Sequence, residues 1–145
     1  MKRWLPLFIV LLTTSCHNGK LQNQQYQEAS ASWVSDYFDA FNRHDWQTFA
    51  SFYADTCRFL DPSLGVEEVK QSREEVRDRY AQLGAVIADV QDSVISTYHS
   101  SQDEVVIEFI SMGTDKGGRF RLPICTIFKL REGKIISDHT YYDNF

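Results

Sequence analysis

The fold class is decided by the stretch Trp33-Val34-Ser35-Asp36-Tyr37-Phe38-Asp39-Ala40-Phe41-Asn42-Arg43-His44-Asp45. From Ser30 onward, apolar side chains recur about every three or four residues, which predicts an amphipathic helix. The polar turn 42–45 breaks this pattern, and Asp45 is suited to cap a second helix. That second helix carries one aromatic stripe, formed by Trp46, Phe49, Phe52 and Tyr53. The domain therefore opens with two short helices joined by a tight turn.

A strand and a third helix are predicted next. The strand-like stretch 56–61 ends at Pro62 and Gly65, two residue types that favour turns. The third helix begins at the capping box Ser72-Arg73-Glu74-Glu75, in which the serine and the last glutamate each bond the other's backbone. Gly84 is placed to end this helix, whose apolar stripe is Val76, Tyr80 and Leu83.

Everything after Gly84 is predicted to be strand. The segments 86–98, 104–112, 119–131 and 134–143 are rich in β-branched and aromatic residues, and polar or glycine-containing turns separate them. Consecutive strands joined by tight turns form an antiparallel meander. The sequence therefore predicts an α+β domain, with three N-terminal helices packed on a curved antiparallel sheet.

Residues 1–15 are predicted to be an export signal. Met1-Lys2-Arg3 is positively charged, and the apolar run 4–12 is much shorter than the roughly 20 residues of a membrane-spanning helix. The segment Leu12-Thr13-Thr14-Ser15-Cys16 resembles a bacterial lipobox, which implies that Cys16 is lipidated. The alternative is ordinary signal-peptidase cleavage nearby with Cys16 as a free thiol, because Thr13 replaces the usual aliphatic residue.

A lipid on Cys16 implies a cell-envelope protein anchored to a bacterial membrane. In enteric bacteria, an aspartate directly after the lipidated cysteine is associated with retention in the inner membrane. This chain has His17 at that position, which favours the outer membrane. The glutamine-rich residues 16–29 are predicted to be a flexible tether, and residues 30–145 a single domain. Without the two basic residues of the signal, the 15 basic residues fall to 13 against 20 acidic ones, a net charge of −7. This charge argues against nucleic acid as a partner.

The cysteines and histidines do not point to a metal centre. Cys57 and Cys125 could form a disulfide outside the cytoplasm, or remain two buried thiols inside predicted strands. No two histidines show the spacing of metal ligands among His17, His44, His99 and His139. We therefore predict no metal and no cofactor, and both states of the cysteines stay open.

Short segments in a fixed order carry a resemblance to a known family. They are 37–45, 49–55, Phe59-Leu60-Asp61-Pro62-Ser63-Leu64-Gly65, 123–125, 132–135 and 141–143. In this order they resemble the SnoaL-like polyketide cyclase and ketosteroid isomerase superfamily, whose fold is also called nuclear-transport-factor-2-like. The resemblance implies a cone in which the sheet and the helices enclose a deep, mostly apolar pocket.

The resemblance also implies roles for three residues. In ketosteroid isomerases a carboxylate removes a proton next to a carbonyl group, and hydrogen-bond donors hold the enolate oxygen. Asp61 falls on the general base, Tyr37 on a phenol donor, and Cys125 on a second donor that is a carboxylic acid in the isomerases. A thiol is a weak donor. Each residue also has a structural explanation: Asp61 ends a strand, Tyr37 packs in the core, and Cys125 is a small buried apolar residue.

The last strand adds polar candidates. If Cys125 faces the pocket and alternation is followed through the Gly133 turn, the inward residues are Asp138, Thr140 and Tyr142. SnoaL-like cyclases keep polar catalytic groups there, so Asp138 is a third catalytic candidate and Tyr142 a pocket residue. A slip of one residue would instead turn inward His139, Tyr141 and Asp143.

Two functions are compatible with these residues. The first is an envelope-tethered enzyme for proton transfer or cyclisation on a small carbonyl compound, with Asp61 as base, Tyr37 as donor and Asp138 assisting. The second is a non-catalytic module that binds a small apolar ligand or a partner at the cell envelope. The departure at Cys125 favours binding, whereas the Asp61 and Tyr37 pair favours catalysis.

A homodimer is predicted from the segment 119–131, whose residues alternate between two faces. The odd face contains Cys125 and is assigned to the pocket, which leaves outside the even residues Phe120, Leu122, Ile124, Thr126, Phe128 and Leu130. Such an apolar row is rarely exposed on a monomer, so a second copy is expected to cover it. If the assignment is out of phase by one residue, the even face lies under the helices and needs no partner.

Overall fold

The computed structural model describes residues 32–101 and 103–143. The predicted signal 1–15, the lipidated Cys16 and the tether 16–29 lie outside the described residues. Within the described ranges, no helix is long and apolar enough to cross a membrane.

The first helix covers the described residues 32–42, and a tight turn leads into α2 (Trp46–Ala50). Asp45 caps α2 as predicted, because its Oδ1 accepts a hydrogen bond of 3.0 Å from the Thr48 amide. The prediction was wrong for Phe52, which lies in the turn after α2, and for Tyr53, which begins the first strand.

Six strands form one sheet: β1 (Tyr53–Leu60), β2 (Val69–Ser72), β3 (Gln91–Ser101), β4 (Glu104–Asp115), β5 (Gly118–Arg131) and β6 (Lys134–Tyr141). Their order across the sheet is β2-β1-β6-β5-β4-β3. Strands β3 to β6 form the predicted antiparallel meander. Strand β1 extends it by pairing parallel to β6, and β2 pairs antiparallel with β1. The sheet is therefore mixed and not antiparallel throughout.

The third helix, α3 (Arg73–Val86), lies between β2 and β3, so it does not precede the whole sheet. Its capping box forms as predicted: Ser72 Oγ accepts from the Glu75 amide at 3.2 Å, and Glu75 Oε2 accepts from the Ser72 amide at 2.6 Å. Gly84 does not end α3. A Cβ atom at Gly84 would lie 2.6 Å from the Trp46 ring, so glycine allows Trp46 to pack closely against α3.

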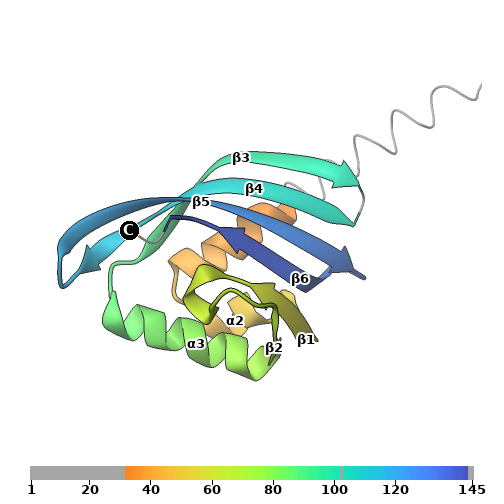
Figure 1. The fold of residues 1–145 in the computed structure, drawn as a ribbon, viewed down its shortest axis with the longest axis horizontal. Helices are drawn as coiled ribbons and strands as arrows, with labels where there is room; N and C mark the ends of the chain where they lie inside the picture. Colours follow the sequence, from red (N-terminus) through yellow and green to blue (C-terminus); the bar gives the residue numbers. More distant parts are fainter. Residues whose placement is uncertain (1–31, 102, 144–145) are drawn as a thin grey trace, which may run out of the picture. The chain divides into compact units, whose positions relative to one another are not determined.

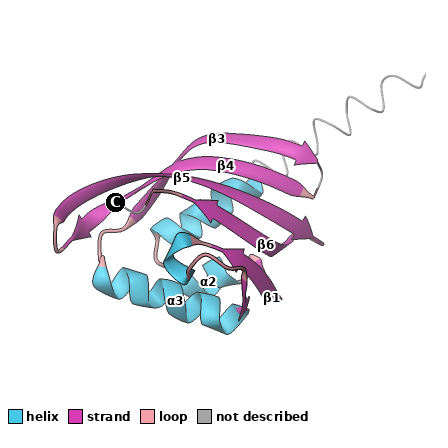
Figure 2. Cartoon of the chain, viewed as in Figure 1, coloured by secondary structure: helices cyan, strands magenta, loops and turns pink. Residues whose placement is uncertain are grey.

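The three helices lie on one side of the curved six-stranded sheet, giving the α+β cone fold (Figures 1 and 2). Aromatic rings fill the space between the layers, and the buried ones include Tyr37, Phe38, Phe41, Phe49, Tyr53, Phe59, Phe109 and Phe128. Neighbouring rings contact one another mostly edge-on or tilted, which is the favoured geometry of aromatic pairs. This core fixes the positions of the polar groups described below.

The prediction for β5 was out of phase by one residue. Thr126 and Phe128 are each 1% exposed and face the helices. Cys125 pairs with Glu108 and Tyr141, which are exposed on the opposite face of the sheet. The even face is thus covered within the chain, so the argument for a partner on that face is lost. Burying the apolar row of β5 under the helices removes more apolar surface from water. The residue-by-residue alignment with the ketosteroid isomerases, which placed Cys125 in the pocket, was therefore displaced by one position.

The structure also decides between the two states of the cysteines, because Cys57 and Cys125 are free thiols. Cys57 is 1% exposed in the core, whereas Cys125 faces the other side of the sheet. Strand β6 lies between β1 and β5, which carry them. A disulfide requires two close Cβ atoms that point toward each other, and residues on opposite faces of a sheet do not meet this condition.

Candidate functional site

A cavity of about 320 Å³ lies between the helices and the inner face of the sheet. Its wall is mostly apolar, with Phe38, Phe41, Phe49, Leu83, Phe109 and Phe128 among its residues. A few polar side chains interrupt this wall, and the charged or acidic ones are Asp61, Arg79, Asp92 and Asp138. An apolar cavity with a few convergent polar groups is the usual form of a small-molecule site.

Asp138, on β6, is 3% exposed and accepts three hydrogen bonds from hydroxyl groups. Tyr53 donates to Oδ2 at 3.0 Å, whereas Thr126 and Thr140 donate to Oδ1 at 2.9 and 2.8 Å. The hydroxyl of Tyr37 lies 2.8 Å from that of Tyr53. A continuous chain of hydrogen bonds therefore leads from Asp138 through Tyr53 to Tyr37.

The protonation of Asp138 decides the direction of this chain. Burial raises the pKa of the Asp138 carboxyl, although the three hydroxyl donors oppose the rise. Burial also raises the pKa values of Tyr37 and Tyr53 well above the ordinary one, so both phenols keep their protons. When Asp138 is ionised, Tyr53 donates to it and Tyr37 donates to Tyr53. When Asp138 is protonated on Oδ2, it donates to Tyr53, and Tyr53 in turn donates to Tyr37. The Tyr37 hydroxyl can then donate into the cavity.

Asp61 caps the short 3-10 helix η1 (Pro62–Leu64) at the wall of the same cavity. Its Oδ1 accepts from the Ser63 amide at 2.8 Å, the Ser63 hydroxyl at 2.7 Å and the Tyr142 hydroxyl at 3.0 Å. Its Oδ2 lies 3.6 Å from Nη1 of Arg79. Asp61 therefore satisfies local donors after a strand, as its structural explanation predicted, and it also lines the cavity.

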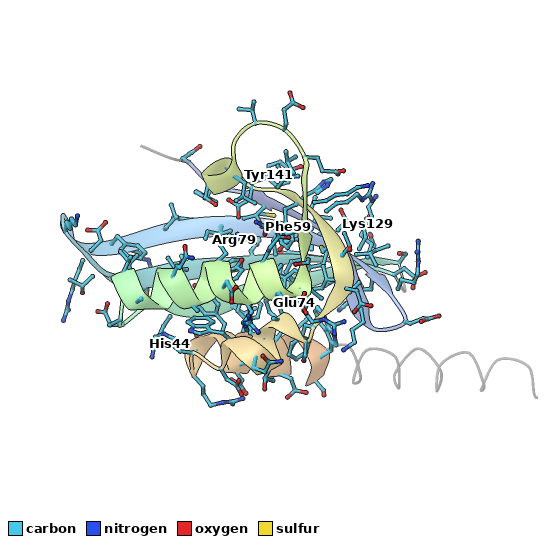
Figure 3. The ribbon with its side chains drawn as sticks, turned by 90° about the horizontal axis from the view of Figure 1, so that it is seen from below. His44, Phe59, Glu74, Arg79, Lys129 and Tyr141 are labelled. Carbon is cyan, nitrogen blue, oxygen red and sulfur yellow. The ribbon has the colours of Figure 1, made fainter. Side chains whose placement is uncertain are left out.

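Arg79 extends from α3 between two aromatic rings, and Figure 3 shows it beside Phe59. Its guanidinium carbon lies 4.8 Å from the centre of the Phe59 ring and 4.7 Å from that of Tyr80, which is favourable for a cation. Nε and Nη2 of Arg79 are buried and have no hydrogen-bond partner in the described part of the chain. The positive charge is thus held beside Asp61 at the wall of the cavity.

Asp92, the second residue of β3, is a cavity residue that sequence analysis missed. Asn42 holds its backbone: Nδ2 donates to the Asp92 carbonyl at 2.9 Å, and Oδ1 accepts from the Asp92 amide at 2.7 Å. Part of Asp92 reaches the surface, yet its Oδ1 is buried and accepts no hydrogen bond from any described residue. Removal from water raises the pKa of Asp92 to about 7, and a hydrogen bond from Ser111 opposes this.

The cavity brings together four of the residues singled out from the sequence, namely Tyr37, Asp61, Asp138 and Tyr142. Cys125 was assigned to the pocket wrongly, and Thr126 takes the inward position beside it. Arg79 and Asp92 were missed because no local motif marks them. Among the described residues, no group of three or more His, Cys, Asp or Glu side chains could hold a metal ion.

Comparisons with known proteins agree with this architecture. The SnoaL-like domain family matches residues 34–137 of the chain. No curated protein matches the chain by sequence. A hypothetical protein with a ketosteroid isomerase-like fold from Catenulispora acidiphila, in complex with trimethylamine, is 25% identical with a TM-score of 0.68. The alignment covers 77% of this chain and 85% of that chain.

Two further solved structures share the fold at lower identity. IdmH from Streptomyces antibioticus, a proposed polyketide cyclase, is 19% identical with a TM-score of 0.67, covering 79% of this chain and 91% of its own. An LEH-like epoxide hydrolase from M. tuberculosis is 13% identical with a TM-score of 0.64, and the alignment covers 77% of this chain and 80% of that chain. The family match spans most of the cone, from the first helix into β6. The chain therefore belongs to the SnoaL-like domain family.

Proposed function

We propose that this domain catalyses proton transfer, or cyclisation through an enolate, on a small carbonyl compound bound in the cavity. The observation that carries the proposal is that Asp61, Tyr37 and Asp138 all line one mostly apolar cavity. A carboxylate and a phenol around one space are the groups needed to remove a proton next to a carbonyl and to hold the resulting oxyanion. The fold is shared with a proposed polyketide cyclase and an epoxide hydrolase.

In this mechanism Asp61 accepts the proton from the carbon next to the carbonyl group. Its Oδ1 is held by Ser63 and Tyr142. Its Oδ2 lies 3.6 Å from Nη1 of Arg79, beyond hydrogen-bond distance, so Oδ2 is the oxygen left for the substrate. Tyr37 donates a hydrogen bond to the enolate oxygen, and this requires the direction of the chain that a protonated Asp138 sets up. Thr126 faces inward but donates to Asp138, so Tyr37 supplies the oxyanion contact.

Deuterium exchange tests this proposal without knowledge of the natural substrate. The domain is incubated in D₂O with 2-tetralone or cyclohexenone, and NMR follows the loss of the proton next to the carbonyl. The unaltered domain should exchange it faster than buffer, and Asp61→Asn should abolish the excess. Tyr37→Phe should slow it by about 100-fold to 1,000-fold, the usual loss for one oxyanion donor.

The control for this experiment is Asp39→Asn, which removes an exposed carboxylate from the same helix as Tyr37. Its exchange rate should equal that of the unaltered domain. Exchange at the buffer rate with every ketone, or full exchange in Asp61→Asn, would contradict the mechanism.

The second candidate is a non-catalytic module that binds a small ligand in the same cavity. It is favoured by the hydrogen bonds that already occupy Asp61 Oδ1 and both oxygens of Asp138. A protein of similar fold was crystallised with a small molecule, trimethylamine. Ligand binding without any deuterium exchange would select this candidate.

We further propose that the domain is tethered to the outer membrane by lipid on Cys16, after removal of residues 1–15. Several acyl chains on one cysteine anchor a protein stably, whereas one chain binds only weakly. Cys16→Ser should therefore move the protein from the membrane fraction to the soluble fraction. Mass spectrometry showing an unlipidated N-terminus elsewhere on membrane-extracted protein would exclude the anchor.

A homodimer stays a proposal, but through the other face of the sheet. With the corrected phase, the outer face carries Val106 of β4 and Cys125 and Ile127 of β5, with Tyr98 and Tyr141 exposed to either side. A contact on this face would be isologous if it follows a two-fold axis. Sedimentation of the lipid-free domain from residue 26 onward measures whether the dimer forms.

A further inference from the structure

Asp92 is a carboxyl group for which the proposed mechanism has no use. Its side chain lines the cavity, and its buried Oδ1 has no hydrogen-bond partner among the described residues. Buried polar atoms in native proteins are nearly always paired, so each exception calls for an explanation. A ligand that brings a donor to this oxygen is one such explanation.

Three carboxyl groups that line the cavity differ in the groups that stabilise their negative charge. Asp61 has the guanidinium of Arg79 beside it, and Asp138 has three hydroxyl donors. Ser111 lies opposite Asp92 on β4, and Asp92 forms no ion pair with any described residue. The cavity wall therefore holds an ion pair at Asp61 and, at Asp92, a carboxyl group that forms no ion pair within the described part of the chain.

The surroundings of Asp92 suit a cation with an apolar body. Phe109 and Ser111, its neighbours on the inner face of β4, also line the cavity, and Phe38 packs on Phe109 with ring centres 5.1 Å apart. Electron-rich faces of such rings attract ammonium groups, and the attraction grows when the group is removed from water. An ammonium ion would also supply the donor that Oδ1 lacks.

We propose that the cavity takes a small ligand with an apolar body and a protonated amine, whose ammonium group pairs with the Asp92 carboxylate. The pairing concerns binding alone, so it applies to a substrate as well as to a ligand that is not turned over. It goes beyond the proposed proton-transfer chemistry and does not depend on it.

Pairing with an ammonium group requires Asp92 to be ionised. Asn42 of the first helix bonds its backbone, and Ser111 of β4 is its cross-strand partner. Tyr37 of the first helix and Tyr80 of α3 line the cavity with it. Both phenols stay neutral because burial raises their pKa values. Asp92 has a pKa of about 7, so an amine that binds at about pH 6 displaces its proton. At about pH 8 the carboxylate is already present, and no proton is released.

Three probes of one size test the proposal: benzylamine, benzyl alcohol and benzoate. Isothermal titration calorimetry at about pH 8 should show benzylamine binding at least tenfold more tightly than benzyl alcohol, with benzoate weakest. Titrations at about pH 6 in two buffers of different ionisation enthalpy should show release of close to one proton per bound amine. Asp92→Asn should lose at least tenfold in benzylamine affinity, abolish the proton release and leave benzyl alcohol unaffected.

Glu108→Gln is the matched control, because it removes one exposed carboxylate from the outer face of the sheet. It should bind benzylamine as the unaltered domain does, and circular dichroism confirms the fold of both variants. Equal binding of amine and alcohol, tighter binding of benzoate, or unchanged amine binding in Asp92→Asn would each overturn the proposal. None of these results depends on the deuterium exchange, so the two proposals can fail separately.

Discussion

Replacing Asp92 with asparagine should stabilise the domain at about pH 8 and change its stability little at about pH 4. An aspartate in an unfolded chain has a pKa of about 3.9, whereas Asp92 has a pKa of about 7 in the fold. The folded state therefore binds an additional proton between these values, and its stability falls as pH rises through this window. Above the window, the unaltered domain has to hold a buried carboxylate that forms no ion pair with any described residue.

The expected gain for Asp92→Asn at about pH 8 is up to about 4 kcal/mol, from a shift of about three pH units at about 1.4 kcal/mol each. Urea unfolding at about pH 4 and pH 8 measures the free energy of unfolding at both ends of the window. Glu108→Gln, at an exposed position, should shift neither value. Equal stability of Asp92→Asn and the unaltered domain at pH 8 would show that the carboxyl group is not desolvated.

Replacing Phe49 with alanine should lower the free energy of unfolding by about 3–5 kcal/mol, the usual cost of deleting a buried phenylalanine ring. Phe49 is 1% exposed. Its ring centre lies 4.7 Å from that of Tyr37 and 4.6 Å from that of Tyr80, and it also contacts the rings of Phe41, Trp46 and Tyr53. The substitution therefore removes the ring that holds two cavity phenols in position.

Phe49→Leu is the matched variant for this prediction, because it keeps an apolar side chain of closer volume and should cost less than half as much. Denaturant unfolding gives both values, and an unchanged denaturant slope shows that the unfolded state is the same. A loss below about 1 kcal/mol in Phe49→Ala would mean that the neighbouring rings collapse into the space.

Signals that depend on near neighbours predicted the helix starts correctly. Asp45 bonds the amide of Thr48, and Ser72 exchanges bonds with Glu75. Partners three residues apart meet through helical geometry alone, so residue type and spacing suffice to predict them. The end of α3 was predicted less well, because Gly84 serves contact with a distant tryptophan and not a local turn.

The faces of β5 and β6 show where alternation reaches its limit. The apolar row of β5 alone indicates the correct inward face. The alignment with the ketosteroid isomerases instead turned Cys125 inward. Asp138 was nevertheless predicted to face inward. The prediction assumed that the inward positions change from odd residues on β5 to even residues on β6 across the turn, and this assumption cancelled the error at Cys125. The strands pair Phe128 with Asp138, and their register shifts between Lys129 and Leu130. Alternation along one strand carries no information about such an irregularity.

Strand β2 was not predicted, and the candidates Tyr37 and Asp61 came from the family resemblance. The sequence by itself determined the two opening helices, the capped helix starts, the meander of the last four strands and the apolar face of β5. These features follow from residue type and spacing along the chain. Only the tertiary structure decided that Tyr53 links Tyr37 to Asp138, which lies 85 positions after Tyr53. It also decided that Asn42 bonds the backbone of Asp92, 50 positions away. Burial and proton affinity depend on which distant elements exclude water, and packing alone brings those elements together.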